Sequence, residues 1–151
     1  MVDGNLQSPS LHCYFAIDNR IGLAQALASQ EPTRNFVRQV TGSNLWVLTR
    51  GDLGTDFRGL PDGERLRSLM ADLRAAFEYV LVDVPPLSNF SDAAMFARLS
   101  DGVVLVLESC STRRECARKA KVRLESAGVR VLGAVLNKRT FPIPQSLYDR
   151  L

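Results

Sequence analysis

The sequence predicts an α/β protein built on a doubly wound, mainly parallel sheet with helices on both faces. Short apolar runs such as 102–107 and 129–136 suit buried strands, and they alternate with segments whose apolar residues recur at helical spacing. Glycine, proline and aspartate stand at the joints between these segments, where the chain must turn. Strands that are apolar on both faces need helices on each side of the sheet. The length of 151 residues suits one domain, so we expect a single domain over 1–151.

The individual elements follow from local patterns. Apolar residues recur every three or four positions between 66 and 77, which predicts an amphipathic helix. Thr112 and Glu115 have the spacing of a capping box, which would begin a helix that carries Cys116 on its apolar face and ends at Gly128. Strands are expected at 45–49, 79–83, 102–107 and 129–136, with a further strand end at Val2, and helices at 23–28, 66–77, 91–99 and 112–128.

Composition argues against several classes of protein. The longest apolar runs fall far short of the roughly 20 residues that a membrane span needs, so we expect no transmembrane segment in this chain. The N-terminus lacks the pattern of a signal peptide, and three cysteines without a CxxC pair favour a reducing, cytoplasmic location. The net charge is only +3, which does not indicate a nucleic-acid partner. We interpret the basic run in the helix 112–128 as a solvated face, with DNA contact as the alternative.

Polar residues follow three of the expected strands, at the sheet edge where ligands bind in this fold class. Asp83 and Asn137 each end a strand, and Asp3 joins them if Val2 ends one as well. Asp83 is either an acid that holds Mg²⁺, directly or through water, or a turn and cap residue. Asn137 either binds a nucleobase edge, since an amide offers both donor and acceptor, or stops a strand in a turn. The residues alone leave these alternatives open.

Several segments taken together resemble one family, the cytoplasmic bacterial tyrosine kinases of capsule and exopolysaccharide synthesis. Residues 2–12 and 18–23 are similar to the family's Walker A′ region, and 79–87 to its Walker B segment. Residues 92–93 and 101–106 follow at the expected distances, and 133–138 resembles the last core strand with its base-contacting asparagine. The resemblance covers nearly the whole chain and implies a P-loop NTPase-like fold. Division-site and plasmid-partitioning ATPases share that fold.

The resemblance implies roles for four residues and a cofactor, MgATP. Asp83 would be the Walker B carboxylate that orders the hydration shell of Mg²⁺. Asp3 would be the first Walker A′ acid, near the metal and the attacking hydroxyl. Asn137 would face adenine, and Asn5 stands at the nucleotide site where the second Walker A′ acid is usual. The implied reaction is phosphoryl transfer from ATP to tyrosine. The implied partner and activator is a transmembrane polysaccharide co-polymerase.

The chain departs from the family in the parts that hold phosphate and accept it. Gly-Lys occurs nowhere in the 151 residues, and the family's Gly-Lys-Ser/Thr loop would lie upstream of Asp3. Gln7 stands where an arginine is usual, and Tyr148 is the one tyrosine of 141–151, where the family often has a cluster. We therefore expect a fragment or degenerate form of the kinase domain, truncated at its N-terminus, that alone binds ATP weakly or not at all.

A missing phosphate-loop strand would also leave the strands 79–83 and 102–107 each without a neighbour. Unpaired strand edges invite association, which predicts a rearranged sheet, a homo-oligomer or a partner chain that completes the sheet. Two alternatives to a kinase-type domain remain. One is a fragment of a partitioning-type ATPase, and the other is a non-catalytic interaction module that binds the membrane co-polymerase.

Overall fold

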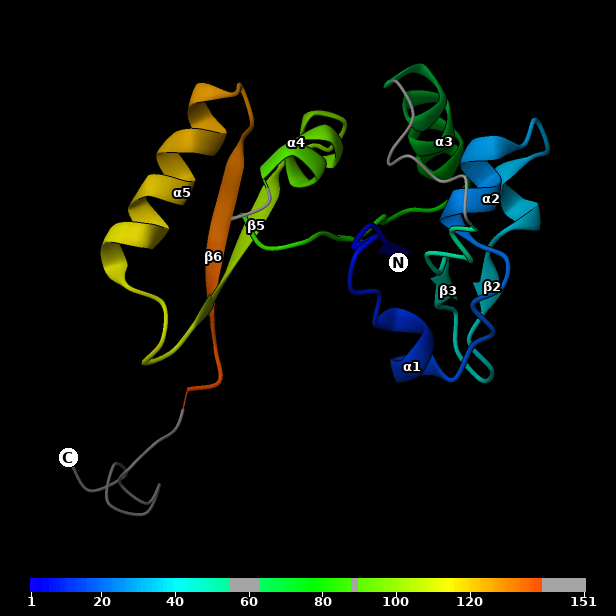
Figure 1. Cartoon of the computed structure of the whole chain (residues 1–151), viewed down its shortest axis with the longest axis horizontal. Coiled ribbons are helices and arrows are strands. Elements are labelled where there is room, and N and C mark those ends of the chain that lie inside the picture. Colours follow the sequence, from blue (N-terminus) through cyan, green and yellow to red (C-terminus); the bar gives the residue numbers. More distant parts are fainter. Residues whose placement is uncertain (55–62, 88–89, 140–151) are drawn as a thin grey trace, which may run out of the picture. The chain divides into compact units, whose positions relative to one another are not determined.

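The computed structural model describes residues 1–54, 63–87 and 90–139, with the side chains of Phe90 and Asp92 left out. The chain divides into two compact units, Met1–Leu99 and Ser100–Leu151, and each is described by itself (Figure 1). The first unit contains the strands β1 to β4 and the helices α1 to α4, and the second contains β5, α5 and β6. The single domain over 1–151 stays a prediction.

The strands of the first unit lie around β1 (Val2–Asp3). It pairs in parallel with β4 (Val82–Asp83), so that Asp3 is the register partner of Asp83. On its other side β1 contacts the chain just after β3 (Trp46–Val47), because the amide of Asp3 donates to the carbonyl of Leu48 at 2.8 Å. A strand that we did not predict, β2 (Arg38–Gln39), pairs antiparallel with β3. The short strand β1 is therefore flanked on both sides.

The helices of the first unit bear out the periodic patterns of the sequence. The predicted helices at 23–28, 66–77 and 91–99 correspond to α2 (Leu23–Ala28), α3 (Gly63–Ala76) and α4 (Phe90–Arg98). Two short elements were not predicted, α1 (Leu11–Phe15) and a 3₁₀ turn at Thr33–Asn35. Helix α1 has five residues and the 3₁₀ turn has three, which is too few to show a period.

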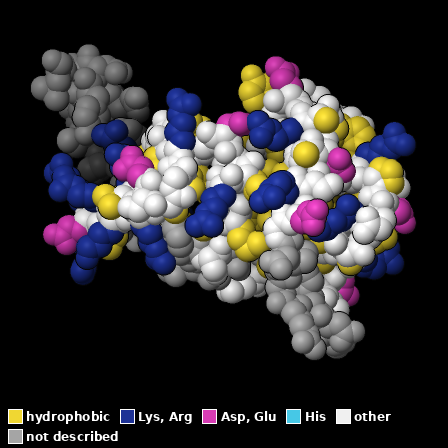
Figure 2. Space-filling model, turned by 90° about the horizontal axis from the view of Figure 1, so that it is seen from above, with side chains coloured by type: hydrophobic (Ala, Val, Ile, Leu, Met, Phe, Trp, Pro, Cys, Tyr) yellow, Lys and Arg dark blue, Asp and Glu magenta, His cyan; other side chains and the backbone are white. Residues whose placement is uncertain are grey.

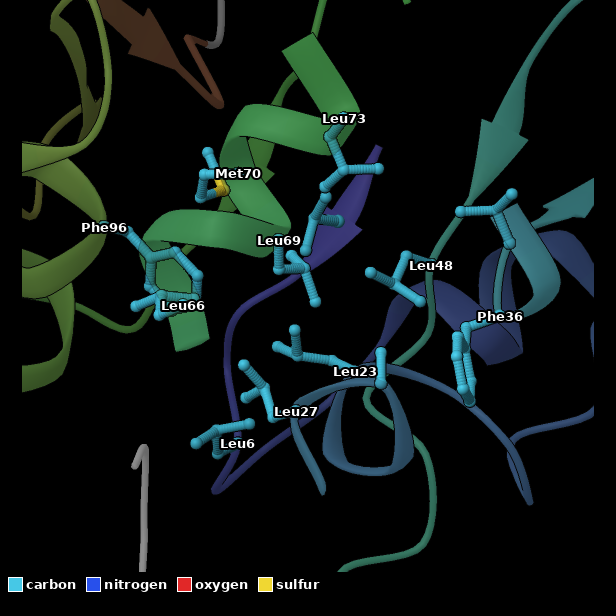
Figure 3. Packing of buried hydrophobic residues seen from close by; sticks show 13 residues of the cluster. Leu6, Leu23, Leu27, Phe36, Leu48, Leu66, Leu69, Met70, Leu73 and Phe96 are labelled. Atoms are coloured by element: carbon cyan, nitrogen blue, oxygen red, sulfur yellow. The ribbon is translucent and has the colours of Figure 1, made fainter. Parts of the chain in front are cut away.

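The hydrophobic core of the first unit joins these helices to the strands (Figure 3). Helix α3 contributes Leu66, Leu69, Met70 and Leu73, all buried, at the spacing that places them on one side of a helix. They pack in one cluster with residues of β1, α2, α4 and the chain after β3, which include Phe96 from α4. This cluster anchors the short β1–β4 pair, which could not be stable on its own.

The second unit is a strand–helix–strand. The strands β5 (Val103–Glu108) and β6 (Val131–Asn137) pair in parallel through six residue pairs, and α5 (Arg114–Ser126) connects them. Helix α5 buries one residue, Leu124, and Gly128 follows its end with a positive φ of 75°. A glycine in the left-handed conformation just past the last turn is the helix stop that the sequence predicts.

The α/β class is confirmed, but the sheet is smaller than expected. The described strands form three two-stranded sheets, β1–β4, β2–β3 and β5–β6, and the doubly wound arrangement stays a prediction. The expected strand 79–83 shrinks to two residues, because β1 begins at Val2 and pairs with β4 only from Val82 onward. Tyr79 and Leu81 are 80% and 63% exposed, and not buried as a central strand would require.

The predicted start of α5 was wrong in detail. The hydroxyl of Thr112 accepts a hydrogen bond from the amide of Glu108 at 2.9 Å, so it serves the loop before the helix. The N-cap residue is Arg113, which makes no side-chain cap. Cys116, expected on the apolar face, is exposed. In the part of the chain that the structure describes, no helix is both long and apolar enough to cross a membrane.

Candidate functional site

The strongest candidate for a functional site is the pair of carboxylates at the end of β1 and β4. Asp3 and Asp83 are register partners on neighbouring parallel strands, and each is the last residue of its strand. Side chains of partnered residues project to the same face of a sheet, so the two acids are neighbours. The sequence predicted that both would lie at one sheet edge, and the structure brings them together.

Asp3 is completely buried and has a structural task. Its Oδ2 accepts hydrogen bonds from the amides of Ser10 and Leu11, at 3.0 and 3.1 Å, where α1 begins. A carboxylate at this place satisfies amides that the first turn of a helix leaves without partners. The other oxygen, Oδ1, is also buried and has no hydrogen-bond partner in the described parts of the chain. An unpaired buried acceptor costs about 1–3 kcal/mol, so this oxygen is suited to receive a donor or a hydrated cation.

Asp83 is half-buried beside Asp3. Burial raises the pKa of the Asp83 carboxyl above its ordinary value, and the negative charge of Asp3 raises that pKa further. Two carboxylates that repel each other at a partly buried edge form a site of negative potential. A bound divalent cation would act in the opposite direction, because its charge favours the ionised form of Asp83.

The backbone after Asp3 is held tightly against β4. The amide of Gly4 donates to the carbonyl of Asp83 at 2.8 Å. A Cβ at position 4 would lie 2.8 Å from that same carbonyl oxygen and 2.9 Å from the ring of Phe96. Contacts this short mean that any side chain at position 4 would force the β4 backbone or the Phe96 ring to shift. Glycine at this position therefore lets the chain leave β1 while it stays against the strand that carries the second acid.

Asn5 and Arg50 order the loop that follows. The Oδ1 of Asn5 accepts a hydrogen bond from the backbone amide of Ser8 at 3.1 Å, so the Asn5 side chain closes a turn. The guanidinium of Arg50 donates to the carbonyl of Leu6 at 3.2 Å and to that of Gly51 at 3.0 Å. Sequence reasoning missed Arg50, and no local signal could have found it, because the contact joins residues 44 positions apart.

Asn137 lies in the second unit, at the end of β6. Its side-chain Oδ1 accepts a hydrogen bond from the amide of Lys138 at 2.9 Å, and its carbonyl accepts one from Ser109 at 2.8 Å. Lys138 has a positive φ of 54° and forms an ion pair with Glu108 at 2.8 Å. The Asn137 side chain is exposed and turns the chain out of the strand. Its role toward adenine and that of Asn5 toward the nucleotide stay predictions.

The donor set suits a hydrated metal ion better than a directly caged one. Among the described residues, no group of three or more His, Cys, Asp or Glu side chains could enclose a metal. Two carboxylates with one free buried oxygen fit Mg²⁺, which keeps most of its water and is usually bound through one or two acids and the phosphates of its substrate. The site can therefore orient and neutralise charge around a phosphoryl group, if the phosphates are held by other groups.

Comparison with known sequences identifies relatives that are described as kinases. No model of a protein family matches the chain. The tyrosine-protein kinase YwqD of Bacillus subtilis is 31% identical over 137 residues, which is 91% of this chain and 58% of that protein. CapB of Staphylococcus aureus is 28% identical over 148 residues, 98% of this chain and 65% of that protein. The chain thus spans less than two thirds of the length of either relative.

Solved structures agree with the sequence comparison. The kinase domain of VpsO has a TM-score of 0.83 and 28% identity, over 92% of this chain and 69% of that structure. The kinase domain of the Escherichia coli tyrosine kinase ETK has a TM-score of 0.81 and 26% identity, over 95% of this chain and 58% of that one. A chimerical protein, CapA2B2, has a TM-score of 0.83 and 27% identity, over 93% and 62%.

Proposed function

Because this chain belongs to the family of bacterial tyrosine kinases, by sequence and by fold, we propose that it is part of an ATP-dependent protein-tyrosine kinase domain that regulates capsular or exopolysaccharide synthesis and export. The observation that carries the proposal is the pairing of Asp3 with Asp83 at the ends of two adjacent parallel strands. Phosphoryl transfer needs charge neutralisation and positioning more than covalent chemistry, and a carboxylate edge that binds a hydrated cation supplies both.

MgATP is the cofactor of the proposed site. Asp83 and the free Oδ1 of Asp3 would hold the water shell of Mg²⁺, and Asn137 and Asn5 would contribute to nucleotide binding. When bound, Mg²⁺ supplies positive charge to the phosphates and to the two carboxylates. The chain's own contribution is a rigid edge, since the second oxygen of Asp3 is locked by the amides of Ser10 and Leu11.

We further propose that this chain alone binds MgATP weakly or not at all, as a fragment or degenerate form would. The 151 residues contain no Gly-Lys sequence, so no P-loop lysine is present to neutralise the phosphates. The acids at the proposed site would repel a triphosphate, and only the metal would offset that repulsion. The Walker B role of Asp83 is a metal-ordering role, and it does not replace a phosphate cradle.

The proposed partner is a transmembrane polysaccharide co-polymerase, which would keep the chain at the cytoplasmic face of the membrane. The family resemblance supports this, as does the likeness to the chimerical protein CapA2B2. A homo-oligomer or a completing chain is also proposed. The carbonyls of Leu81 and Asp83 accept from β1, so the peptide groups of Val80 and Val82 point to the opposite edge of β4. Among the described strands none pairs with that edge.

A second candidate function is a non-catalytic module that binds the co-polymerase without nucleotide. The specific observation that favours it is again the lack of a Gly-Lys sequence. In this case Asp3 would serve only to cap α1, and the raised pKa of Asp83 would have no catalytic meaning.

One experiment separates these functions. MgATP binding is measured by calorimetry, and phosphotyrosine by immunoblot, for the chain alone and with the cytoplasmic segments of a candidate co-polymerase. We expect no measurable affinity for the chain alone, and phosphotyrosine with the partner that disappears in Asp83→Asn. Micromolar MgATP affinity of the chain alone would contradict the weak-binding proposal. A partner that binds but never induces phosphotyrosine would favour the non-catalytic module.

A further inference from the structure

The positive charge of the chain is concentrated in one short region. Between residues 113 and 130 lie seven of the 19 lysines and arginines but only two of the 16 acids, a net charge of +5. The other residues hold 12 basic and 14 acidic side chains and are net negative. Figure 2 shows Lys and Arg side chains over the whole visible face of the molecule, and the sequence places seven of the 19 within or directly beside α5. The modest charge of the whole chain therefore conceals a strongly basic helix.

The basic side chains surround the exposed part of α5. Arg114, Arg118 and Lys121 recur at i, i+4 and i+7, which places them along one flank of the helix. Lys119 and Arg123 recur at i and i+4 along the other flank. Only Leu124 is buried, so the helix rests on the second unit through a narrow stripe.

An apolar residue lies between the two basic flanks. Val122 is 55% exposed, and it stands two positions from the buried Leu124. Residues two positions apart in an α-helix are separated by about 200° around its axis, so Val122 points away from the side that packs. The exposed face of α5 thus combines one apolar side chain with cations on either side.

Most of these cations have no ion pair with an acid in the part of the chain that the structure describes. Lys121 pairs with Glu125 at 3.1 Å. Within the described residues, Arg113, Arg114, Arg118 and Lys119 have no ion pair with an acid. Neighbouring cations on a helix repel each other and destabilise it. The approach of an external anion offsets this repulsion, so such a row of charges favours an anionic partner.

We propose that this exposed face of α5 binds the surface of an anionic phospholipid bilayer. Charge complementarity is the main argument, because clusters of four to eight Lys and Arg on an amphipathic helix suit acidic headgroups. Val122 fits the boundary between headgroups and acyl chains, where basic helices insert their apolar residues. Nucleic acid is less well matched, since residues 113–130 include no aromatic side chain to stack on bases, whereas the exposed Val122 has a place at a lipid surface.

The proposed contact between α5 and the bilayer does not depend on the nucleotide site of the proposed function. It is consistent with a partner that lies in the same membrane. Each basic residue near an anionic surface contributes a factor of about five in affinity, so the loss of three would lower vesicle binding by about 100-fold. The interaction is screened by salt, and it would weaken steeply as ionic strength rises above the physiological range.

The test is co-sedimentation of the full chain with phosphatidylcholine vesicles that contain or lack phosphatidylglycerol. The test variant replaces Arg114, Arg118 and Lys119 with Gln, which keeps helix propensity and removes three charges. The control variant replaces Arg34, Arg67 and Arg98 with Gln, three exposed residues of the first unit. Circular dichroism verifies that both variants are folded.

We expect salt-sensitive binding to vesicles that contain phosphatidylglycerol. The control variant should retain this affinity, and the affinity of the α5 variant should be about 100-fold lower. Equal loss in both variants, or equal binding to neutral vesicles, would overturn the proposal. Tighter binding to duplex DNA than to the vesicles, lost in the α5 variant, would overturn it in favour of a nucleic-acid surface. Because no arm of the test uses nucleotide, its failure would leave the proposed kinase function untouched.

Discussion

Replacing Gly4 with alanine tests whether the close contact behind Asp3 builds the carboxylate edge. The new Cβ would lie 2.8 Å from the carbonyl oxygen of Asp83, 2.9 Å from the ring of Phe96 and 3.1 Å from Cγ1 of Val82. The first contact is with backbone that Gly4 itself binds, so relief would separate the chain after β1 from β4. The second is with a side chain that is 2% exposed and has little room to move.

The structure allows the destabilisation to be estimated. Forcing one extra methyl group into a packed core costs about 1–3 kcal/mol. Weakening the hydrogen bond from the Gly4 amide to the Asp83 carbonyl adds about 0.5–1.5 kcal/mol. We therefore expect Gly4→Ala to lower the free energy of unfolding by about 2–4 kcal/mol, of the order of a quarter to a half of the stability of a small domain.

Trp46 makes the assay direct, because it is the only tryptophan and lies in the first unit. Urea unfolding followed by its fluorescence should show a midpoint lower by about 1–3 M in Gly4→Ala. The matched control is Gly63→Ala, at the first position of α3, where a Cβ meets no atom of the described residues within 4 Å. That change should leave the midpoint unchanged or raise it slightly. A free energy of unfolding of Gly4→Ala within about 0.5 kcal/mol of that of the parent would refute the close packing behind the site.

Two further predictions concern the core and the acid pair. Leu69→Ala removes a fully buried side chain of α3 and should cost about 2–5 kcal/mol in urea unfolding, whereas Leu81→Ala, at a residue 63% exposed, should change stability by less than about 0.5 kcal/mol. The raised pKa of Asp83 means that the folded state disfavours the ionised form of this carboxyl. The parent should therefore lose stability relative to Asp83→Asn as pH rises from the ordinary aspartate pKa through the raised one. Above that window the difference in free energy of unfolding between the two proteins should stay constant. Parallel stability–pH curves for the two proteins would show that Asp83 is not perturbed.

Local patterns in the sequence were sufficient to locate the four longer helices, apart from the exact start of α5, and to place the two acids at strand ends. The apolar period of 66–77 depends only on neighbours a few residues apart, and α3 formed there; the helix expected at 23–28 formed as α2. The acids Asp3 and Asp83 could be placed at one edge because the carboxyl ends of parallel strands meet there. The β-branched run 129–136 likewise sufficed to locate β6.

Burial and partner choice were a different matter, because they depend on residues far apart in the chain. The run 79–83 has the composition of a buried strand, yet Tyr79 and Leu81 are exposed, because burial needs a packed neighbour over the face of the strand and composition does not supply one. Val106 in β5 is 67% exposed for the same reason. The apolar run 102–107 suits a buried strand, but only a packed neighbour can bury its side chains. The antiparallel pairing of β2 with β3 also left no signal strong enough to read, since each strand has only two residues.

The amino-acid order alone established the α/β class, the amphipathic helices and the presence of acids at strand ends, since each of these follows from spacing along the chain. The tertiary structure determined what these residues do. One oxygen of Asp3 binds the amides at the start of α1, the other is buried without a partner in the described residues, and Gly4 lies against the carbonyl of Asp83. Such assignments depend on how segments dozens of residues apart pack together, and that information is not contained in any local pattern.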